Sequence, residues 1–396
     1  MKTKSKIPAL RFKGFTDAWE QRKLGDAVSI SSGVTGDATL QDGKYRLTRI
    51  ESISQGMLNV GRLGFTNEKP DQKYLLNLGD ILYSNINSLS HIGKVALVDT
   101  TGIYHGMNLL RFQMRNGVDS EFLFQRLNTM PMKNWAVSHA NPAVSQASIN
   151  QTELSKQPIS SPTLTEQQQI GNFFKEIDNT IALHQRKLDL LKEQKKGFLQ
   201  KMFPKNGKKV PELRFAGFAD DWEERRLGEE CQITMGQSPN GKTYSETPSD
   251  YILVQGNADL KDGWVFPRVW TTQKTKTAEA GDLILSVRAP VGTIGKTAYD
   301  VVIGRGVASI KGNEFIYQLL TKMNLSGYWT KLSAGSTFES INSDSIQNAL
   351  IFIPPETEQQ QIGSFFKQLD NTIALHQRKL DLLKELKKAL LRQLFV

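Results

Sequence analysis

Two stretches of the chain carry hydrophobic residues at alternating spacings of four and three, with polar residues between them. This is the heptad pattern of a helix that packs against a partner along its whole length. It predicts two long helices, over residues 165–203 and 357–395. The seam positions are Ile170, Phe174, Ile177, Ile181, His184, Leu188, Leu191, Lys195, Phe198 and Met202, and then Ile362, Phe366, Leu369, Ile373, His376, Leu380, Leu383, Lys387, Leu390 and Leu394.

Each predicted helix has a start signal. Thr165 and Thr357 follow proline-containing stretches and stand three residues before Gln168 and Gln360, which is the spacing of a capping box. We therefore expect these threonines to cap the two helices. Pro204 ends the first helix, because proline cannot continue the backbone hydrogen bonding.

The segments before the two helices have the patterns of mixed α and β structure. Short apolar runs bounded by turn residues predict strands. The runs are GDILYSNI (79–86), GKVALVD (93–99), NLLRFQM (108–114), YILVQG (251–256) and GDLILSV (281–287). The amphipathic segments SEFLFQRLNTM (120–130) and NEFIYQLLTKM (313–323) predict short helices at equivalent places.

The two halves of the chain are copies of one another. Residues 8–26 match residues 211–229 at 12 of 19 positions, and residues 165–203 match residues 357–395 at 30 of 39. The tails share DNTIALHQRKLDLLKE without a single change. A further landmark, IGK, ends at Lys94 in one half and at Lys296 in the other, whereas the segments between landmarks are nearly unrelated. The halves therefore share a fold but diverged unevenly.

The predicted fold is α+β, with two pseudo-repeated mixed α/β domains and two long helices. The predicted parts are a first domain (1–162), a first helix (163–203), a second domain (204–354, with a basic linker at 204–212) and a second helix (355–396). The pattern alone leaves open whether the helices pair antiparallel within one chain or parallel between two chains.

The charge of the chain favours an anionic partner. The formal net charge is +10 over 396 residues, which is typical of proteins that bind nucleic acid but is also found in basic proteins that do not. Cys231 is the only cysteine, so no disulfide framework and no cysteine-based zinc site can form. No apolar run has the length of a membrane span or a signal peptide, and we expect a soluble, cytoplasmic protein without a membrane partner.

Motifs that carry chemistry are few. The segment GQSPNGKT (236–243) matches the phosphate-binding pattern G-x-x-x-x-G-K-T. Such a site needs a helix directly after the loop, whereas a proline and a predicted strand follow here, so a P-loop ATPase is a disfavoured alternative. His184 and His376 repeat one seam position, where a polar residue more often fixes helix register than binds metal. We predict no catalytic residue and no metal site.

Three pieces of the second half and their first-half counterparts resemble the specificity subunit of type I restriction-modification enzymes. They are ELRFAGFADDWEERRLGE, GDLILSVRAPVGTIGK and IPPETEQQQIGSFF. The resemblance covers nearly the whole chain. It implies two target-recognition domains that each read one half of a split, asymmetric double-stranded DNA sequence. It also implies that the two helices form an antiparallel coiled coil that holds the domains apart, in a chain that is not itself an enzyme.

The resemblance implies partners as well. Two methyltransferase subunits, which methylate adenine with S-adenosylmethionine, bind a subunit of this kind. Two restriction subunits, which are motor nucleases that use ATP and Mg, complete the enzyme. No cofactor is expected on this chain. The alternative is a stand-alone DNA-binding or coiled-coil scaffold protein.

Polar side chains that suit base edges or phosphates occur where loops follow predicted strands. The DNA-binding candidates are Arg49, Asn85, Asn87 and Lys94 in the first domain, and Gln255, Asn257, Arg288 and Lys296 in the second. Lys94 and Lys296 recur in both domains, so they suit a phosphate contact or a shared role in the fold. For each candidate, a solvated surface position is an equally good interpretation.

The outward faces of the two helices recur although packing does not constrain them. The residues concerned are Gln185, Arg186, Lys187 and Lys192, with their copies Gln377, Arg378, Lys379 and Lys384. Identical faces suit one kind of partner bound twice under pseudo-two-fold symmetry. A recent recombination that copied the DNA is the alternative explanation.

Overall fold

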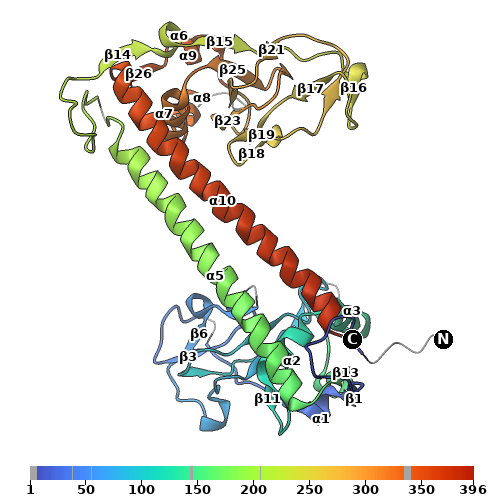
Figure 1. Cartoon of the computed structure of the whole chain (residues 1–396). Coiled ribbons are helices and arrows are strands. Elements are labelled where there is room, and N and C mark those ends of the chain that lie inside the picture. The colour runs from blue at the N-terminus through green and yellow to red at the C-terminus, as the bar shows by residue number, and fades with distance from the viewer. Residues whose placement is uncertain (1–6, 38, 55, 143–145, 206, 334–339) are drawn as a thin grey trace. The chain divides into compact units, whose positions relative to one another are not determined.

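The structure is a computed structural model, and it describes residues 7–396 apart from 38, 55, 143–145, 206 and 334–339. The chain divides into two compact units, whose elements can be followed by colour in Figure 1. The first unit comprises the described residues up to Gln185 together with Arg378–Val396, and the second comprises Arg186–Gln377. Each long helix therefore begins in one unit and ends in the other.

In the first unit the described strands form four sheets. The strands are β1 (Glu20–Lys23), β2 (Val28–Ser32), β3 (Tyr45–Leu47), β4 (Ile53–Ser54), β5 (Met57–Leu58), β6 (Gly64–Thr66), β7 (Ile81–Tyr83), β8 (Ile86–Asn87), β9 (Val95–Leu97), β10 (Ile103–Tyr104), β11 (Leu110–Met114), β12 (Ala147–Ser148) and β13 (Pro158–Ser161). The helices are α1 (Leu24–Ala27), α2 (Ser120–Leu127), α3 (Met130–His139), α4 (Gln151–Ser155) and the first part of α5 (Leu164–Lys201), with 3-10 turns η1 (Ile50–Ser52), η2 (Val60–Arg62) and η3 (Gln72–Tyr74).

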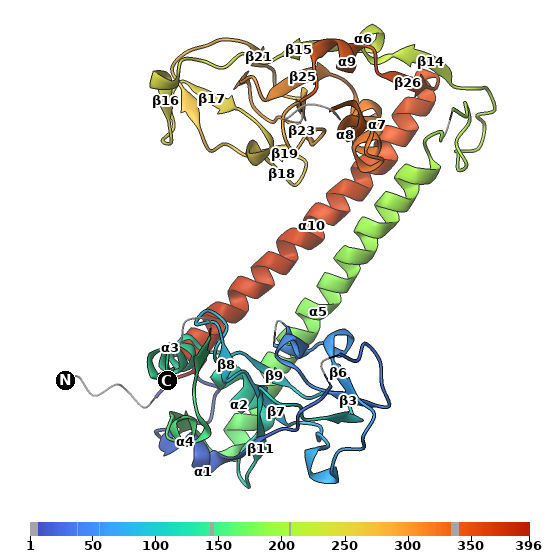
Figure 2. The same ribbon diagram turned by 180° about the vertical axis from the view of Figure 1, so that it is seen from behind.

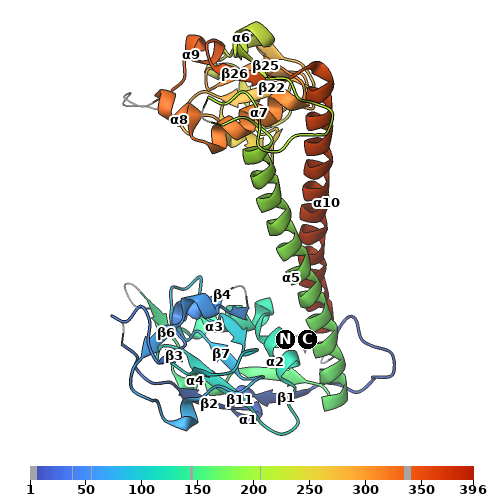
Figure 3. The same ribbon diagram turned by 90° about the vertical axis from the view of Figure 1, so that its left-hand side faces the viewer.

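The main sheet of the first unit has the strand order β2-β11-β7-β9-β5-β4. The strands predicted over 79–86, 93–99 and 108–114 are observed as β7, β9 and β11, which are neighbours in this sheet. A smaller sheet has the order β10-β3-β6, in which β10 runs parallel to β3. Figure 3 shows α2 beside the first turns of α5, and Figure 2 shows α3 beside the last turns of α10.

The second unit repeats this plan. Its strands are β14 (Glu223–Arg226), β15 (Gln232–Met235), β16 (Tyr244–Ser245), β17 (Tyr251–Val254), β18 (Leu260–Lys261), β19 (Trp264–Val265), β20 (Trp270–Thr271), β21 (Thr277–Ala278), β22 (Leu283–Ser286), β23 (Ile294–Lys296), β24 (Val301–Ile303), β25 (Val307–Lys311) and β26 (Leu350–Ile353). Its helices are α6 (Leu227–Glu230), α7 (Glu314–Leu325), α8 (Tyr328–Ser333), α9 (Ser343–Gln347) and the first part of α10 (Glu356–Leu394), with 3-10 turns η4 (Gly241–Thr243) and η5 (Asn257–Asp259).

The main sheet of the second unit has the order β15-β25-β22-β23-β19-β18, in which every strand takes the place of a counterpart in the first unit. A second sheet has the order β16-β20-β17-β24-β21, with β24 parallel to β17. The predicted strands over 251–256 and 281–287 are observed as β17 and β22. The predicted short helices are observed as α2 and α7, so the mixed α/β prediction is confirmed for both domains.

An aromatic cluster attaches each domain to both long helices. Its buried members are Trp19, Phe122, Phe174 and Phe395 in the first unit, and Trp222, Phe315, Phe366 and Phe203 in the second. The ring centroids of Trp19 and Phe122 lie 5.6 Å apart at an interplanar angle of 64°. Trp222 and Phe315 have the same distance and angle. Each domain therefore packs on the start of one long helix and on the end of the other.

Within each unit the two helical segments run antiparallel. In the first unit, Phe174 near the start of α5 stacks on Phe395 just beyond α10, while Asp178 further along α5 binds Lys387, which is earlier in α10. The second unit repeats this order with Phe198 against Phe365 and with Lys195 against Asp370. The predicted antiparallel pairing is thus observed in each unit.

The lysines of the predicted seam are paired rather than left unsatisfied. Lys387 Nζ donates to Asp178 at 2.6 Å, and Lys195 Nζ lies 2.6 Å from Asp370 Oδ1. Each aspartate also accepts a hydrogen bond of 2.8 Å from the Nε2 atom of a domain glutamine, which is Gln125 in the first unit. A slip of one helix along the other would separate these charges, so the two ion pairs fix the register of the seam.

The capping prediction is wrong by about two residues. The helices begin at Leu164 and Glu356, so Thr165 and Thr357 lie inside the first turn. In α10 the carbonyl of Pro355 already accepts backbone hydrogen bonds of 2.9 and 3.0 Å from that turn. The helical hydrogen bonding of α10 therefore starts two residues before Thr357.

The repeated motifs LRF and TEQQQ meet in one ion pair per unit. Arg11 Nε and Nη2 donate to the carboxylate of Glu166 at 2.7 and 2.8 Å, and Arg214 binds Glu358 at the same distances. Both glutamates are fully buried. The hydrogen bonds to these carboxylates raise the pKa of both arginines. This pair ties the repeated LRF segment of each half to the start of a long helix.

Candidate nucleic-acid interface

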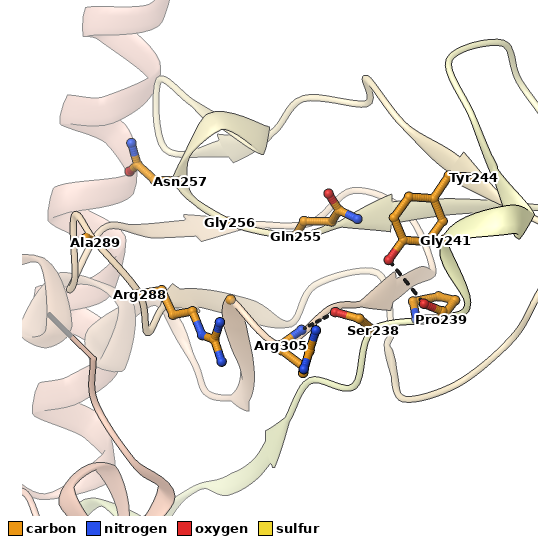
Figure 4. A pocket seen from close by; sticks show the side chains of 11 residues that line it. Ser238, Pro239, Gly241, Tyr244, Gln255, Gly256, Asn257, Arg288, Ala289 and Arg305 are labelled. Carbon is orange, nitrogen blue, oxygen red and sulfur yellow. Dashed lines mark hydrogen bonds between the residues drawn. The ribbon is translucent and has the colours of Figure 1, made fainter. Parts of the chain in front are cut away.

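In the second domain the structure brings three predicted DNA-binding residues into one pocket of about 500 Å³. These are Gln255 and Asn257, which follow β17, and Arg288, which follows β22. The pocket contains one arginine that the sequence did not single out, Arg305 in the turn between β24 and β25. In Figure 4 the two arginines lie along one side of the pocket, with Gln255 and Asn257 along the other and Tyr244 at one end.

Backbone hydrogen bonds hold the two arginine-bearing loops together. The N–H of Val287 donates to the carbonyl of Gly306 at 2.9 Å, so each arginine is one residue away from this bond. The N–H of Arg305 donates to Ser238 Oγ at 3.1 Å. A Cβ atom at Gly306 would lie 1.9 Å from the carbonyl oxygen of Gln255, and only glycine permits this close approach. The loops are therefore fixed at their backbones, and the arginine side chains project from them.

The segment that resembles a P-loop forms another wall of this pocket through Ser238, Pro239 and Gly241. It continues into the 3-10 turn η4 and then into strand β16. No α-helix follows to direct its N–H groups at a phosphate, as the sequence predicted. The loop-to-helix arrangement of a P-loop is therefore not formed at this position.

The first-domain candidates do not come together in the same way. Asn85 donates its Nδ2 to the carbonyl of Ile149 at 3.1 Å, and Asn87 donates its Nδ2 to Ser84 Oγ at 3.1 Å. Arg49 Nη2 donates to a backbone carbonyl at 3.3 Å. All three side chains thus support the local structure, and their contact with DNA stays a prediction.

The turn between β10 and β11 is the first-domain counterpart of the turn that carries Arg305. It contains His105, which is fully buried and whose Nε2 lies 3.0 Å from the carbonyl oxygen of Leu109. Burial lowers the pKa of His105 to about 4, because the charged imidazolium loses its hydration.

The prediction that Lys94 and Lys296 occupy equivalent positions is wrong. In the main sheet of the second unit, Ile294 pairs with Leu285. In the main sheet of the first unit, the residue that pairs with the equivalent Tyr83 is Val95. The IGK motif is therefore shifted by three residues between the two domains, because the turn before β23 is shorter. The position of Lys296 corresponds to Leu97.

Lys296 is held inside the second domain. Its Nζ donates to the Glu314 carboxylate at 2.9 Å and lies 4.4 and 5.1 Å from the ring centroids of Tyr317 and Trp264. These contacts favour a structural role. Lys94 is half-buried, and the part of the chain that the structure describes gives its amine no hydrogen-bond acceptor.

The outward helix residues are accessible, as a partner-binding face requires. The side chains of Arg186, Lys187 and Lys192 are exposed on α5, and their copies Arg378, Lys379 and Lys384 are exposed on α10, whereas Gln185 and Gln377 are half-buried. Four leucines outside the seam are exposed beside them: Leu183, Leu190, Leu375 and Leu382. The two helices thus present matching faces of basic and apolar side chains.

Among the described residues, no three His, Cys, Asp or Glu side chains are grouped so as to hold a metal ion. The described helices are also not apolar enough over a sufficient length to cross a membrane.

These features define a class of protein with two copies of one mixed α/β domain, each bearing polar side chains at its strand ends and each packed on two antiparallel helical segments. The chain belongs to the family described as type I restriction modification DNA specificity domain, which matches residues 16–193 and again residues 219–385.

Two relatives of the chain are named as specificity subunits of type I restriction enzymes. It is 32% identical over 394 residues to the MjaX specificity subunit of a type I restriction enzyme from Methanocaldococcus jannaschii, covering 95% of this chain and 92% of that protein. The MjaVIII specificity subunit of the same organism is 21% identical over 407 residues, with the same coverage.

Two solved structures share the fold. The S subunit of a type I restriction-modification system from M. genitalium aligns with a TM-score of 0.68 at 15% identity, covering 98% of this chain and 99% of that one. A chain from a study of complex assembly and conformational transition of the type I R-M system aligns with a TM-score of 0.55 at 22% identity, covering 95% and 97%.

Proposed function

We propose that this chain is the DNA-reading subunit of a type I restriction-modification enzyme and that it catalyses neither methylation nor cleavage. Each domain reads one half of a split, asymmetric double-stranded target. The observation that carries the proposal is that two domains on one scaffold differ where their strands end. Arg288 follows β22, whereas Ile86 occupies that place in the first domain. Different side chains meet different base edges, so the two half-sites differ.

Two methyltransferase subunits bind the outward faces of α5 and α10. Leu183 and Leu190 are exposed seven residues apart on α5, and Leu375 and Leu382 repeat them on α10. Exposed leucines at this spacing suit the packing of a further helix. The same face occurs twice, which supports two copies of one partner.

The remaining functions belong to the partner subunits. S-adenosylmethionine binds the methyltransferase subunits, which methylate adenine. ATP and Mg serve two restriction subunits, which are motor nucleases.

Mapping of methylated adenines tests the proposal. We expect the chain, expressed with its methyltransferase subunit, to direct methylation to a bipartite motif, and the chain alone to incorporate no labelled methyl groups. Replacing residues 20–160 by the first domain of another family member should change one half of the motif. A change in both halves, or methyl transfer by the chain alone, would refute the proposal. A parallel dimer that binds no methyltransferase subunit would support the scaffold alternative.

A matched insertion tests whether the helices set the spacer between the half-sites. Seven residues are added to both helices, between Lys187 and Leu188 and between Gln377 and Arg378, points that the ion pairs 178–387 and 195–370 place opposite each other. The seam stays in phase because its repeat is seven residues. The helices lengthen by about 10 Å, roughly three base pairs of DNA. We expect unchanged half-sites with a longer spacer, or lost binding, and altered half-sites at the old spacing would contradict this.

A further inference from the structure

We propose that the pocket of the second domain reads a guanine and that Arg305 is the residue that specifies it. The inference rests on the proposed function and deepens it, because it names a base in one of the two half-sites and the side chain that selects it. It is carried by the charge of the pocket, by its anchored loops and by its contrast with the first domain.

The charge of the pocket is positive. Among the residues that the structure describes, none of the eleven that line the pocket is acidic, and two of them are arginines. The nearby carboxylate of Asp259 is already engaged, since it accepts hydrogen bonds from the N–H of Gln255 at 2.7 Å and from Arg268 Nε at 3.0 Å. The pocket therefore suits a partner that presents hydrogen-bond acceptors.

The two pocket arginines differ from the other arginines of the second domain. Those at positions 214, 225, 226 and 268 donate to carboxylate or amide oxygens within the second unit. The side chains of Arg288 and Arg305 make no hydrogen bond or ion pair with any residue that the structure describes. Both side chains are exposed, and the loops that carry them are bonded to each other through Val287 and Gly306. Two such guanidinium groups in one pocket repel each other, and a bound acceptor relieves this repulsion.

The first domain lacks both arginines. The position of Arg288 is occupied by Ile86, since each bridges to the serine of the repeated SIN motif. The turn that corresponds to the Arg305 turn, residues 105–109, contains no arginine. A contact to the phosphate backbone carries no sequence information and could be common to both domains. If the two half-sites differ in sequence, the side chains that distinguish them are expected to be those that occur in one domain only.

The guanidinium group fits guanine better than the other bases. Its two parallel N–H groups match the O6 and N7 acceptors on the major-groove edge of guanine, whereas adenine presents a donor beside N7. Of the two arginines we assign Arg305, because its turn lies directly against Gln255, as the close approach of Gly306 to the Gln255 carbonyl shows, and because its own N–H is bonded to Ser238 Oγ. A side chain on a fixed backbone loses less conformational freedom on binding. Arg288 lies beside it, and Gln255 and Asn257 across the pocket can contact a neighbouring base.

The test uses the complex of this chain with its methyltransferase subunit and duplexes in which every position of the second half-site is varied. We expect the wild-type complex to prefer guanine at one position. Arg305→Gln should lower that preference by about tenfold or more. Arg305→Lys should not restore it, because lysine keeps the charge but lacks the paired N–H groups. The first half-site and the spacer should be unchanged in both variants.

Arg225→Gln is the matched control, because Arg225 is an exposed arginine of the same domain that is paired with Glu223 outside the pocket. It should leave the preference intact. The proposal is overturned if Arg305→Gln keeps the wild-type preference. It is also overturned if methylation falls equally for all sequences and Arg305→Lys restores it, which is the behaviour of a phosphate contact. If the wild-type complex methylates no bipartite motif, it is the proposed function that fails.

Discussion

The two domains agree closely where they touch the long helices and differ where their strands end. The tryptophan and phenylalanine that pack on the helices have the same ring geometry in both domains, and the buried arginine–glutamate pairs have the same distances. By contrast, Arg288 replaces Ile86, and a turn with an exposed Arg305 replaces one with a buried His105. Packing on two nearly identical helices constrains the first set of residues in the same way in both domains, whereas the second set has no contact with those helices in common.

A third difference lies inside the sheets. Leu97 of the first domain is paired with Met57, and the corresponding Lys296 of the second domain is paired with Trp264. The apolar pair is thus replaced by a lysine between two aromatic rings and a carboxylate. The same sheet position is therefore occupied by an apolar side chain in one domain and by a charged side chain in the other.

The largest effect is expected where the domains agree most. Arg11→Ala leaves the buried Glu166 without its partner, and Arg214→Ala does the same to Glu358. Each change should lower the free energy of unfolding of its unit by about 3–5 kcal/mol, because a buried charge loses its compensation. Urea unfolding followed by domain-resolved hydrogen exchange measures both. Arg225→Ala, which removes an exposed pair, should cost less than about 1 kcal/mol. Clearly unequal losses from the two buried pairs would break the comparison.

The next effect is a difference between the two domains in how their stability depends on pH. His105 has a pKa of about 4 in the folded protein against about 6.5 when unfolded, so between these values the unfolded chain binds more protons. Stability of the first domain should therefore fall as the pH is lowered from 6.5 to 4, by about 3 kcal/mol from this group. The second domain, residues 204–354, contains no histidine. Urea unfolding of the wild type and of His105→Gln across this range measures the effect, and identical pH dependence in the two proteins would contradict it.

The smallest effect concerns the position that the domains fill differently. Lys296→Leu gives the second domain the residue of the first, and it leaves Glu314 with a hydrogen bond only from Gln318. It should cost about 1–2 kcal/mol in chemical denaturation. Adding Glu314→Gln should recover most of that loss, since no carboxylate is then left without its cation. Lys94→Met should change stability by less than about 0.5 kcal/mol.

The long helices and the domain copies could be predicted because they depend on periodicity and repetition. The heptad spacing located α5 and α10 to within about two residues, and the seam lysines were visible as polar interruptions. Their partners were not, because Asp178 and Asp370 lie outside the seam pattern and meet the lysines only through the antiparallel pairing. The IGK repeat gave a wrong correspondence between Lys94 and Lys296, because a matching tripeptide does not reveal the length of the turn before it.

The sequence indicated which types of residue form the site, but it did not indicate which of them lie together in space. Gln255, Asn257 and Arg288 were chosen because they follow strands, and they share a pocket. Asn85 was chosen on the same grounds, yet its side chain binds a backbone carbonyl. Arg305 was missed because it follows a short strand and stands between two glycines, where no hydrophobic pattern indicates an exposed turn. The pairing of β24 with β17 is what brings it beside Gln255.

Phe395 belongs to the aromatic cluster of the first domain, although it is made after almost everything else in the chain. The second unit consists of one contiguous segment, residues 186–377, so all of its parts leave the ribosome one after another. The first unit has to wait for Arg378–Val396, so Trp19 and Phe122 stay incompletely covered while the second half is being translated. The domain that is synthesised first is therefore the one that is completed last, and we expect a truncated product that stops after residue 377 to leave this aromatic surface exposed.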